Sequence, residues 1–285
     1  MTLPALDPVV VRRIVRAALN EDLGDRGDLT TAAVVGGAAR GRGKIVARGD
    51  LVVAGIPVAG EVFRTLDPSL RFEALRAEGG LAAAGDVLAE VSGPARPILE
   101  GERTALNFLG RMCGIATAAR AAVLEVAGTG ATILDTRKTA PGLRALDKYA
   151  VAAGGATNHR TGLFDAVMIK DTHLAIAGPV EDAVALALAA GHPAPIVTAE
   201  VGSIEEMERA IRAGAGGILL DNMDVETLRR CVEQAAGRAR LEASGGLKPG
   251  ALRAVAETGV SFLSLGWLTH SVRAADVALD MEALP

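Results

Sequence analysis

The second half of the chain alternates short apolar runs with helical stretches, and this alternation constrains the fold more than any other feature. The apolar runs, in chain order, are ATILDT, AVMIKD, PIVTAEV, GILLDN, RLEASGG and SFLSLG. A stretch with helical spacing separates each run from the next. Strands that alternate with helices in this way form parallel βα units. Because so long a series contains no glycine-rich dinucleotide fingerprint, the pattern favours an α/β barrel over an open Rossmann sheet.

The first part of the chain predicts a different kind of domain. Asp7 followed by Pro8 is typical of a helix start, and an amphipathic helix is expected over the residues that follow. Between residues 44 and 91, short apolar or alternating runs separated by Gly, Pro and Asp indicate strands and turns. Residues 98–111 return to helical spacing and are expected to lead from one domain to the next. We therefore expect a separate α+β unit before the barrel.

Composition argues against nucleic acid and membranes as partners. The 285 residues carry 30 Lys and Arg against 34 Asp and Glu, a formal net charge of -4, and only 2% are aromatic. Such a chain lacks the basic, base-stacking surface that nucleic acids require. The first residues show no secretory signal pattern, and no window of about 18 uninterrupted apolar residues occurs, so we expect a soluble, cytoplasmic protein. Cys113 and Cys231 have no metal-ligand spacing and are expected to be buried thiols.

Charged and small polar residues stand at the ends of the strand-like runs. These groups are Asp135, Arg137 and Lys138, Lys170 and Asp171, Glu200, Asp221 and Asn222, Glu242 and Ser244, and Ser264 and Gly266. In α/β barrels the active site is built at the carboxyl ends of the strands, where independent strands bring side chains to one opening. The sequence therefore predicts a single polar site at this end of the barrel.

The cations of this predicted site are concentrated in two consecutive loops and in the helix between them. They are Arg137 and Lys138 after the strand, Arg144 and Lys148 on the helix, and His159 and Arg160 after a Gly-Gly pair. Because Arg offers forked donors that match a carboxylate and Lys acts as a point charge, the two loop pairs could clamp a planar dicarboxylate. A solvated cationic loop is the alternative, and for the two helical residues both explanations fit equally well.

A lysine and two carboxylates end neighbouring runs. The alkyl stem of Lys170 is expected to be buried, and its ammonium could bind an anion or, if desolvated, form a Schiff base with a carbonyl substrate. Glu200 and Asp221 could hold Mg2+ through oxygen ligands and water, accept hydrogen bonds from ribose hydroxyls, or pair with nearby cations. The sequence shows no cluster of transition-metal ligands, so Mg2+ is the only metal that we expect.

Small residues close the last two strands of the series. Residues 243–247 read ASGGL and residues 264–266 read SLG. Glycine lets backbone N–H groups approach an anion closely, and a helix N-terminus favours negative charge. Because phosphate sites of barrels commonly lie at the last strands, these turns are expected to bind phosphate. The residues concerned are Ser244, Gly245, Gly246, Ser264 and Gly266.

Several longer motifs resemble one enzyme family. They are GERTALNFLGRMCGIAT, LDTRKTAPGLR, KYAVAAGGATNHR, LFDAVMIKD, LLDN, LEASGG and SFLSLGWLTHS. In this order, over nearly the whole chain, they resemble the quinolinate phosphoribosyltransferase family, also called nicotinate-nucleotide pyrophosphorylase (carboxylating). The resemblance implies an N-terminal α/β sandwich domain and a C-terminal α/β barrel, TIM-like and incomplete or open. We place these domains at residues 1–113 and 114–268, with a C-terminal segment, residues 269–285, that packs back on the first domain.

The resemblance also implies a reaction and its residues. Quinolinate and phosphoribosyl pyrophosphate would react with Mg2+ to give nicotinate mononucleotide, pyrophosphate and CO2, a step of de novo NAD biosynthesis. The family forms homodimers, so Arg103 in GERTALN would reach the neighbouring subunit's site. The residues implied to bind quinolinate or the nearby phosphoribosyl groups are Arg137, Lys138, His159, Arg160 and Lys170. Those implied to act in catalysis are Lys138, Glu200 and Asp221, the last two near ribose and metal, and the phosphate turns are those named above.

Three other functions fit part of the same pattern. A related pyridine phosphoribosyltransferase could use nicotinate, which has no second carboxylate to lose as CO2. A lyase or aldolase barrel with a phosphate handle would form a Schiff base that borohydride traps. A non-catalytic protein that binds nucleotides or anions would not need every charged residue of the predicted site.

Overall fold

The strands form two main sheets that belong to different parts of the chain. The computed structural model describes residues 3–284, and the chain divides into two units. The first unit comprises residues up to 120, residues 139–155 and residues from 268 onward. The second unit comprises residues 121–138 and 156–267. A four-stranded antiparallel sheet lies in the first unit, and a six-stranded parallel sheet lies in the second.

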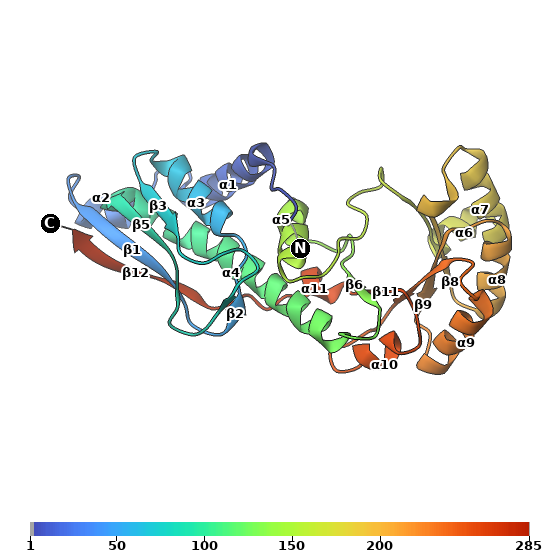
Figure 1. Cartoon of the computed structure of the whole chain (residues 1–285). Helices are drawn as coiled ribbons and strands as arrows, with labels where there is room; N and C mark the ends of the chain where they lie inside the picture. Colours follow the sequence, from blue (N-terminus) through green and yellow to red (C-terminus); the bar gives the residue numbers. More distant parts are fainter. Residues whose placement is uncertain (1–2, 285) are drawn as a thin grey trace. The chain divides into compact units, whose positions relative to one another are not determined.

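The sheet of the first unit contains strands from both ends of the chain. Its strand order is β12-β1-β5-β3. The bounds are Arg40–Ala47 for β1, Arg71–Ala74 for β3, Val87–Pro94 for β5 and Val277–Leu284 for β12. β12 pairs antiparallel with β1, and Figure 1 shows the red C-terminal strand beside the blue β1. Gly43 permits their close packing, because a Cβ there would lie 2.8 Å from the Leu279 side chain.

Helices pack on this sheet, and the first begins where the sequence predicts. The Asp7 carboxylate accepts the Val9 N–H at 2.8 Å, and Pro8 occupies the first turn. Helix α3 packs against β3 and β5, and α1 packs against α3. The helices are α1 (Pro8–Leu23), α2 (Leu29–Val34), α3 (Ile56–Leu66), α4 (Ala95–Glu125) and α5 (Arg144–Ala153). A small sheet pairs β2 (Leu51–Val52) with β4 (Leu81–Ala82).

Glu78 caps the N-terminus of α3. Its carboxylate accepts the Gly55 N–H at 2.9 Å and the Ile56 N–H at 2.9 Å, and it also hydrogen-bonds the Tyr149 hydroxyl. Burial raises the pKa of Glu78 above its ordinary value, although these hydrogen bonds act in the opposite direction. Folding therefore favours the protonated form of this side chain.

Replacing Glu78 by glutamine is expected to change how stability depends on pH. Because its pKa is raised by folding, the contribution of Glu78 to stability is present below its unfolded pKa and declines as the pH rises through its folded pKa. The free energy of unfolding of the wild type minus that of E78Q should therefore fall as the pH rises above about 4, the ordinary pKa of a glutamate. Denaturant unfolding across this range measures the difference, and a difference that rises with pH contradicts the assignment.

All six strands predicted for the second half are present and parallel. Their order is β6-β11-β10-β9-β8-β7. The bounds are Thr132–Leu134 for β6, Val167–Ile169 for β7, Val197–Val201 for β8, Gly217–Asp221 for β9, Arg240–Ser244 for β10 and Phe262–Ser264 for β11. An isolated bridge joins Leu134 to Thr157, but within residues 3–284 no ladder closes the sheet between β6 and β7. The expectation of an incomplete or open α/β barrel is therefore confirmed.

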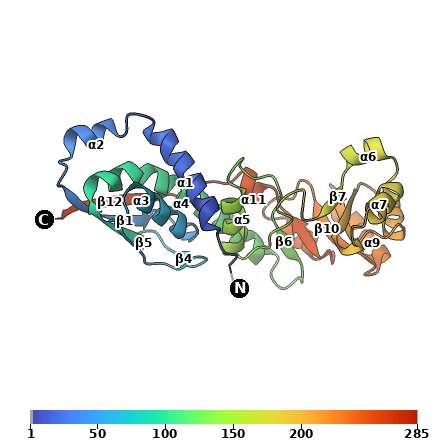
Figure 2. The same ribbon diagram turned by 90° about the horizontal axis from the view of Figure 1, so that it is seen from above.

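Alternation along the strands decides which side chains enter the barrel. In β8, Val197, Ala199 and Val201 are buried toward the outer helices, whereas Glu200 faces the interior. Figure 1 shows α7, α8 and α9 in succession along the outside of the strands, and Figure 2 shows α7 and α9 on that same side. The helices are α6 (Asp171–Ala177), α7 (Val180–Ala189), α8 (Ile204–Arg212), α9 (Val225–Ala235), α10 (Leu252–Ala256) and α11 (Trp267–His270).

The two units interleave along the chain. Residues 139–155, which include α5, belong to the first unit although the sequence places them between two barrel strands. The domain boundaries expected after residues 113 and 268 stay a prediction. Among the described residues, no single helix has the length and apolar character needed to cross a bilayer, and the bent pair α6–α7 meets that test only when both helices are counted together.

Candidate active site

A cavity of about 470 Å3 opens in the second unit at the carboxyl ends of the barrel strands. It is lined by residues from the loops after β6 and β7 and from the ends of β8, β9, β10 and β11. Most of the residues that the sequence assigns to a site lie here. They are Arg137, Lys138, His159, Arg160, Lys170, Glu200, Asp221, Ser244, Gly245, Gly246 and Ser264. The separate strand ends therefore do contribute to one opening.

Cations from two loops meet in this cavity. Arg137 and Lys138 follow β6, and the Arg160 guanidinium donates to the Ala166 carbonyl at 3.1 Å. Burial, and then repulsion from the Arg137 charge, lowers the pKa of Arg160. The negative charges of Asp165 and Glu242 act in the opposite direction on this pKa, but several cations still share one cavity. The arrangement thus suits a negatively charged ligand.

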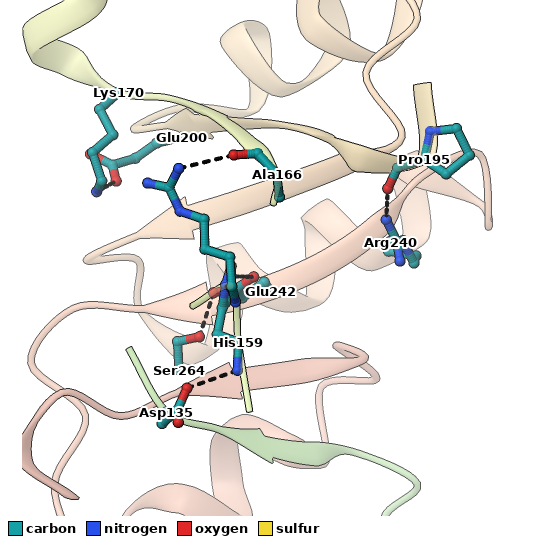
Figure 3. Close-up of polar contacts among 10 residues, drawn as sticks. Asp135, His159, Ala166, Lys170, Pro195, Glu200, Arg240, Glu242 and Ser264 are labelled. Carbon is teal, nitrogen blue, oxygen red and sulfur yellow. Dashed lines mark hydrogen bonds and ion pairs between the residues drawn. The ribbon is translucent and has the colours of Figure 1, made fainter. Parts of the chain in front are cut away.

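Lys170 and Glu200 form an ion pair across two neighbouring strands. Figure 3 shows the Lys170 ammonium and the Glu200 carboxylate directed toward each other. The Lys170 side chain is 40% exposed and that of Glu200 is 13% exposed, so the pair lies at the wall of the cavity with the lysine accessible. A paired ammonium suits charge binding better than Schiff-base chemistry, which requires the neutral amine. His173 caps the following helix α6 by accepting the Lys170 N–H at 2.9 Å.

The turns that follow β9 and β10 contact each other. Asn222 has a left-handed backbone with φ of 54°, its N–H donates to the Ser244 carbonyl at 2.9 Å, and its side-chain amide donates to the Asp221 carboxylate at 2.7 Å. Gly245 also has positive φ, 90°, and a Cβ there would lie 2.3 Å from the Asn222 side-chain oxygen. Glycine is therefore required where the backbone of this turn approaches its neighbour.

Two carboxylates of this cavity, Glu200 and Asp221, could supply oxygen ligands to a Mg2+ ion. Glu200 pairs with Leu219 in the β8–β9 register, and Asp221 lies two residues further along β9 on the same face. Among the described residues, no group of three or more His, Cys, Asp or Glu side chains could hold a metal by itself. Mg2+ commonly takes one or two carboxylates, several waters and substrate phosphates, and a pair of acidic side chains is enough for that arrangement.

Three of the candidate cations and one glycine of the predicted phosphate turns lie outside the lining of this cavity. Arg103 is exposed on α4 in the first unit, where it lines a pocket with Asp22, Asp28 and Glu100. Arg144 and Lys148 lie on α5, also in the first unit. Gly266 precedes α11, two residues after the end of β11.

Beside the cations lies a buried hydrogen-bonded network that the sequence did not predict. Asp135 accepts the His159 N–H at 2.7 Å, and Glu242 lies 3.2 Å from the His159 ring nitrogen Nε2 (Figure 3). Ser264 donates to the other oxygen of Glu242. Asp135 and Glu242 are visible in the sequence as strand-end residues, but only their burial shows that they need partners. The signal that could have revealed Glu242 is a carboxylate at an interior position of an apolar strand.

Most of the chain matches the two domains of one protein family. Residues 28–113 match the quinolinate phosphoribosyl transferase N-terminal domain, and residues 115–280 match its C-terminal domain. The chain belongs to the quinolinate phosphoribosyltransferase family. The resemblance inferred from the motifs is therefore confirmed.

Other members of the quinolinate phosphoribosyltransferase family match this chain over most of their length. A Bacillus subtilis protein named probable nicotinate-nucleotide pyrophosphorylase (carboxylating) is 40% identical over 272 residues, which cover 95% of this chain and 93% of the relative. A chloroplastic nicotinate-nucleotide pyrophosphorylase (carboxylating) from Oryza sativa subsp. japonica is 39% identical, covering 98% of this chain and 80% of the relative. The similarity thus extends across both units.

Solved structures agree with the family assignment. The structure of NadC from Streptococcus pyogenes superposes with a TM-score of 0.94 at 34% identity and covers 99% of this chain and 100% of its own. The nicotinate-nucleotide pyrophosphorylase from Francisella tularensis gives a TM-score of 0.90 at 33% identity, with 99% of both chains covered. The open barrel and the antiparallel sheet are thus shared with the family.

Proposed function

We propose that this protein transfers the phosphoribosyl group of phosphoribosyl pyrophosphate to quinolinate with loss of CO2. The products are nicotinate mononucleotide and pyrophosphate, and the reaction is a step of de novo NAD biosynthesis. One observation carries the proposal: a single cavity of the barrel contains two cationic loop pairs, a lysine, two carboxylates and a glycine turn. This set matches a dicarboxylate, a ribose and phosphate groups that must be held together.

The cations would bind the two anionic substrates next to each other. We assign the quinolinate carboxylates to Arg137, Lys138 and Arg160, with Lys170 between quinolinate and the phosphoribosyl groups. His159 would contribute to quinolinate binding through Arg160, whose N–H donates to its ring. Quinolinate and phosphoribosyl pyrophosphate repel each other, so their approach requires local positive charge. Lys170 is paired with Glu200 before substrate binds, and a substrate anion would compete with that carboxylate for its ammonium.

The turns at the ends of the last strands would bind phosphate. Ser244 ends β10 and is followed by Gly245 and Gly246, while Ser264 ends β11 and Gly266 lies two residues further on. The positive φ of Gly245 and of Gly246 gives this turn backbone shapes that residues with a Cβ rarely adopt. Such turns direct backbone N–H groups toward an anion.

Glu200 and Asp221 would hold Mg2+, directly or through water, together with substrate phosphates. When bound, the ion would supply positive charge that favours departure of pyrophosphate. The two carboxylates would also orient the ribose hydroxyls and stabilise positive charge at the anomeric carbon. Lys138 would balance the negative charge of quinolinate beside them.

The transfer is expected to proceed with inversion. As the bond from the anomeric carbon to pyrophosphate loosens, the ribose gains oxocarbenium character and the pyridine nitrogen attacks the opposite face. The cationic pairs hold the pyridine ring in line for this attack, which is mainly a positioning effect. Once the nitrogen carries a positive charge, the ring accepts the electrons of the adjacent carboxylate as CO2 leaves, so no organic cofactor is required.

We propose that the protein acts as a homodimer in which Arg103 completes the partner's site. Arg103 is exposed on the first unit and is not part of the lining of the barrel cavity, which suits a residue that is lent to another subunit. Arg103→Ala is expected to lower kcat/KM by about 100-fold, since the anionic substrates in the partner's site would lose one charged donor. The exposed Arg64→Ala is the control and should change kcat/KM by about twofold at most.

Mixed dimers test the sharing itself. A chain with Arg103→Ala and a chain with Arg160→Ala are each defective alone, but a mixed dimer of the two would contain one site without either defect. Activity that returns on mixing supports the shared site. Dimers that exchange subunits and stay inactive contradict it, as does an Arg103→Ala dimer that keeps its activity.

Replacing Gly245 by alanine is expected to weaken binding of phosphoribosyl pyrophosphate. The new Cβ would lie 2.3 Å from the Asn222 side-chain oxygen, so the phosphate turn must shift. We expect KM for this substrate to rise about tenfold or more. Gly250→Ala is a matched control, because Gly250 has a similar positive φ of 86° and no atom lies within 4 Å of the position that its new Cβ would take. An equal KM for phosphoribosyl pyrophosphate in both variants would show that this turn does not bind the phosphate.

Turnover of the purified protein tests the function as a whole. Quinolinate, phosphoribosyl pyrophosphate and Mg2+ should yield nicotinate mononucleotide and CO2 in equal amounts. Nicotinate in place of quinolinate is the control, and it should give little product. Turnover with nicotinate alone would favour the related pyridine enzyme, and no turnover by folded protein would contradict the proposal.

A further inference from the structure

Glu242 is a buried carboxylate in the floor of an anion-binding cavity, where a negative charge is at first sight unfavourable. It lies on β10 with its side chain directed into the barrel, and the residue is only 7% exposed. Removing a carboxylate from water is costly unless it is hydrogen-bonded or paired. Its partners are the His159 ring and the Ser264 hydroxyl, and both are residues of the predicted site.

The hydrogen bonds of His159 define which of its ring nitrogens carries the proton. The Arg160 N–H donates to Nδ1 at 2.6 Å, so Nδ1 presents its lone pair. In the neutral ring the proton is then on Nε2, which faces the Glu242 carboxylate at 3.2 Å. The His159 N–H donates to Asp135, whose other oxygen accepts the Asn158 amide at 2.8 Å. The loop and the ring are therefore held by separate carboxylates.

A second cavity explains why the ring needs this anchor. It has a volume of about 380 Å3 and extends toward the amino ends of the strands, where Arg240 donates to the Pro195 carbonyl (Figure 3). His159, Arg160 and Glu242 line both this cavity and the active-site cavity. Because a cavity lies on each side of these three side chains, packing alone does not hold the His159 ring. The hydrogen bond to Glu242 helps to fix its direction, together with the Arg160 N–H at the other ring nitrogen.

We infer that Glu242 is a positioning residue for quinolinate: by holding His159 as the Nε2–H tautomer, it fixes the backbone of Arg160 so that the guanidinium faces the substrate. This inference rests on the proposed function for the identity of the ligand. Arg160 receives its orientation from two sides, from the Nδ1 contact to its N–H and from the Ala166 carbonyl at its guanidinium. Glu242 acts through His159 and makes no contact of its own with quinolinate.

Binding of quinolinate alone, measured by calorimetry, separates this role from a structural one. E242A is expected to raise the Kd for quinolinate about 10- to 100-fold, because a charged hydrogen bond is lost. KM for phosphoribosyl pyrophosphate should change by about twofold at most. E242Q keeps an oxygen for the Nε2 proton and an amide for Ser264, so it should recover most of the affinity. The exposed Glu226→Ala is the control for loss of a carboxylate at the surface.

The double variant E242A/H159A tests whether Glu242 acts through the ring. If it does, the double variant binds quinolinate no more weakly than H159A alone. Additive losses would overturn the inference, as would an E242Q protein that binds as weakly as E242A. An equal loss of affinity for both substrates would also overturn it, because that result indicates a general defect of the fold.

The tautomer can be measured without any substrate. The chain has four histidines, so nitrogen NMR of histidine-labelled protein can assign the His159 ring. The inference predicts the Nε2–H tautomer in the wild type and in E242Q. Because neither protein lacks the Glu242 contact, this test does not depend on whether E242A folds. An Nδ1–H or doubly protonated ring would overturn it. Failure of the proposed function looks different: the wild type would not bind quinolinate, although the tautomer would still report the contact with Glu242.

Discussion

Arg160→Ala is expected to lower kcat/KM for quinolinate by about 100- to 1,000-fold, because truncation leaves one substrate carboxylate without its charged donor. Arg160 is partly buried, and burial together with the Arg137 charge lowers its pKa. A bound anion would therefore interact strongly with this guanidinium. The effect should fall on quinolinate more than on phosphoribosyl pyrophosphate. Steady-state kinetics with each substrate varied in turn measure both.

Two controls make this result specific to the guanidinium. Arg160→Lys keeps the positive charge but loses the fork that matches a carboxylate, so it should recover only part of the lost activity. Arg229→Ala removes an exposed arginine from α9 in the same unit and should leave kcat/KM within about twofold. If Arg160→Lys were fully active, a point charge would suffice and the clamp would be the wrong description.

Asp221→Asn is the second change with a large expected effect. It should lower kcat by about 100- to 1,000-fold. Asn keeps the size of the side chain but removes the charge that would stabilise the anomeric carbon and hold Mg2+. The rise in KM should be small beside the loss in kcat, because the charge matters most when the ribose becomes positive. Single-turnover kinetics at saturating substrate measure this directly.

Asp224→Asn is the matched control for this carboxylate. Asp224 lies three residues after Asp221, in the loop that follows β9, and caps α9 by accepting the Thr227 N–H at 2.7 Å. Asn is also a good N-cap, so the charge is removed without loss of the cap. Similar kcat values for the two variants would contradict a catalytic role for Asp221.

Much of the fold could be predicted because it depends on local periodicity. The alternation of six apolar runs with helical stretches is enough to indicate parallel βα units, and each run proved to be a strand. The start of α1 followed from Asp7 and Pro8, since capping is a contact between neighbours in the sequence. The pairing of β12 with β1 depends on residues more than 200 positions apart and had no local signal.

The candidate site was predictable to the extent that it follows the ends of strands. Lys170, Glu200 and Asp221 were found because parallel strands bring their carboxyl ends to one side of a barrel. Arg144 and Lys148 have the same cationic character, but α5 packs in the first unit. Charge alone therefore did not distinguish residues of the cavity from residues of helix α5 in the first unit.

By itself, the sequence determined the βα alternation, the family and the residue types that end each strand, because these depend on order along the chain. Only the tertiary structure decided that Glu242 faces His159, 83 residues away, and that Asn222 lies against Gly245. Such contacts are set by strand register and by side-chain direction inside the barrel. The physical reason is that burial obliges a carboxylate to find a partner, whereas the choice of partner depends on which strands lie side by side.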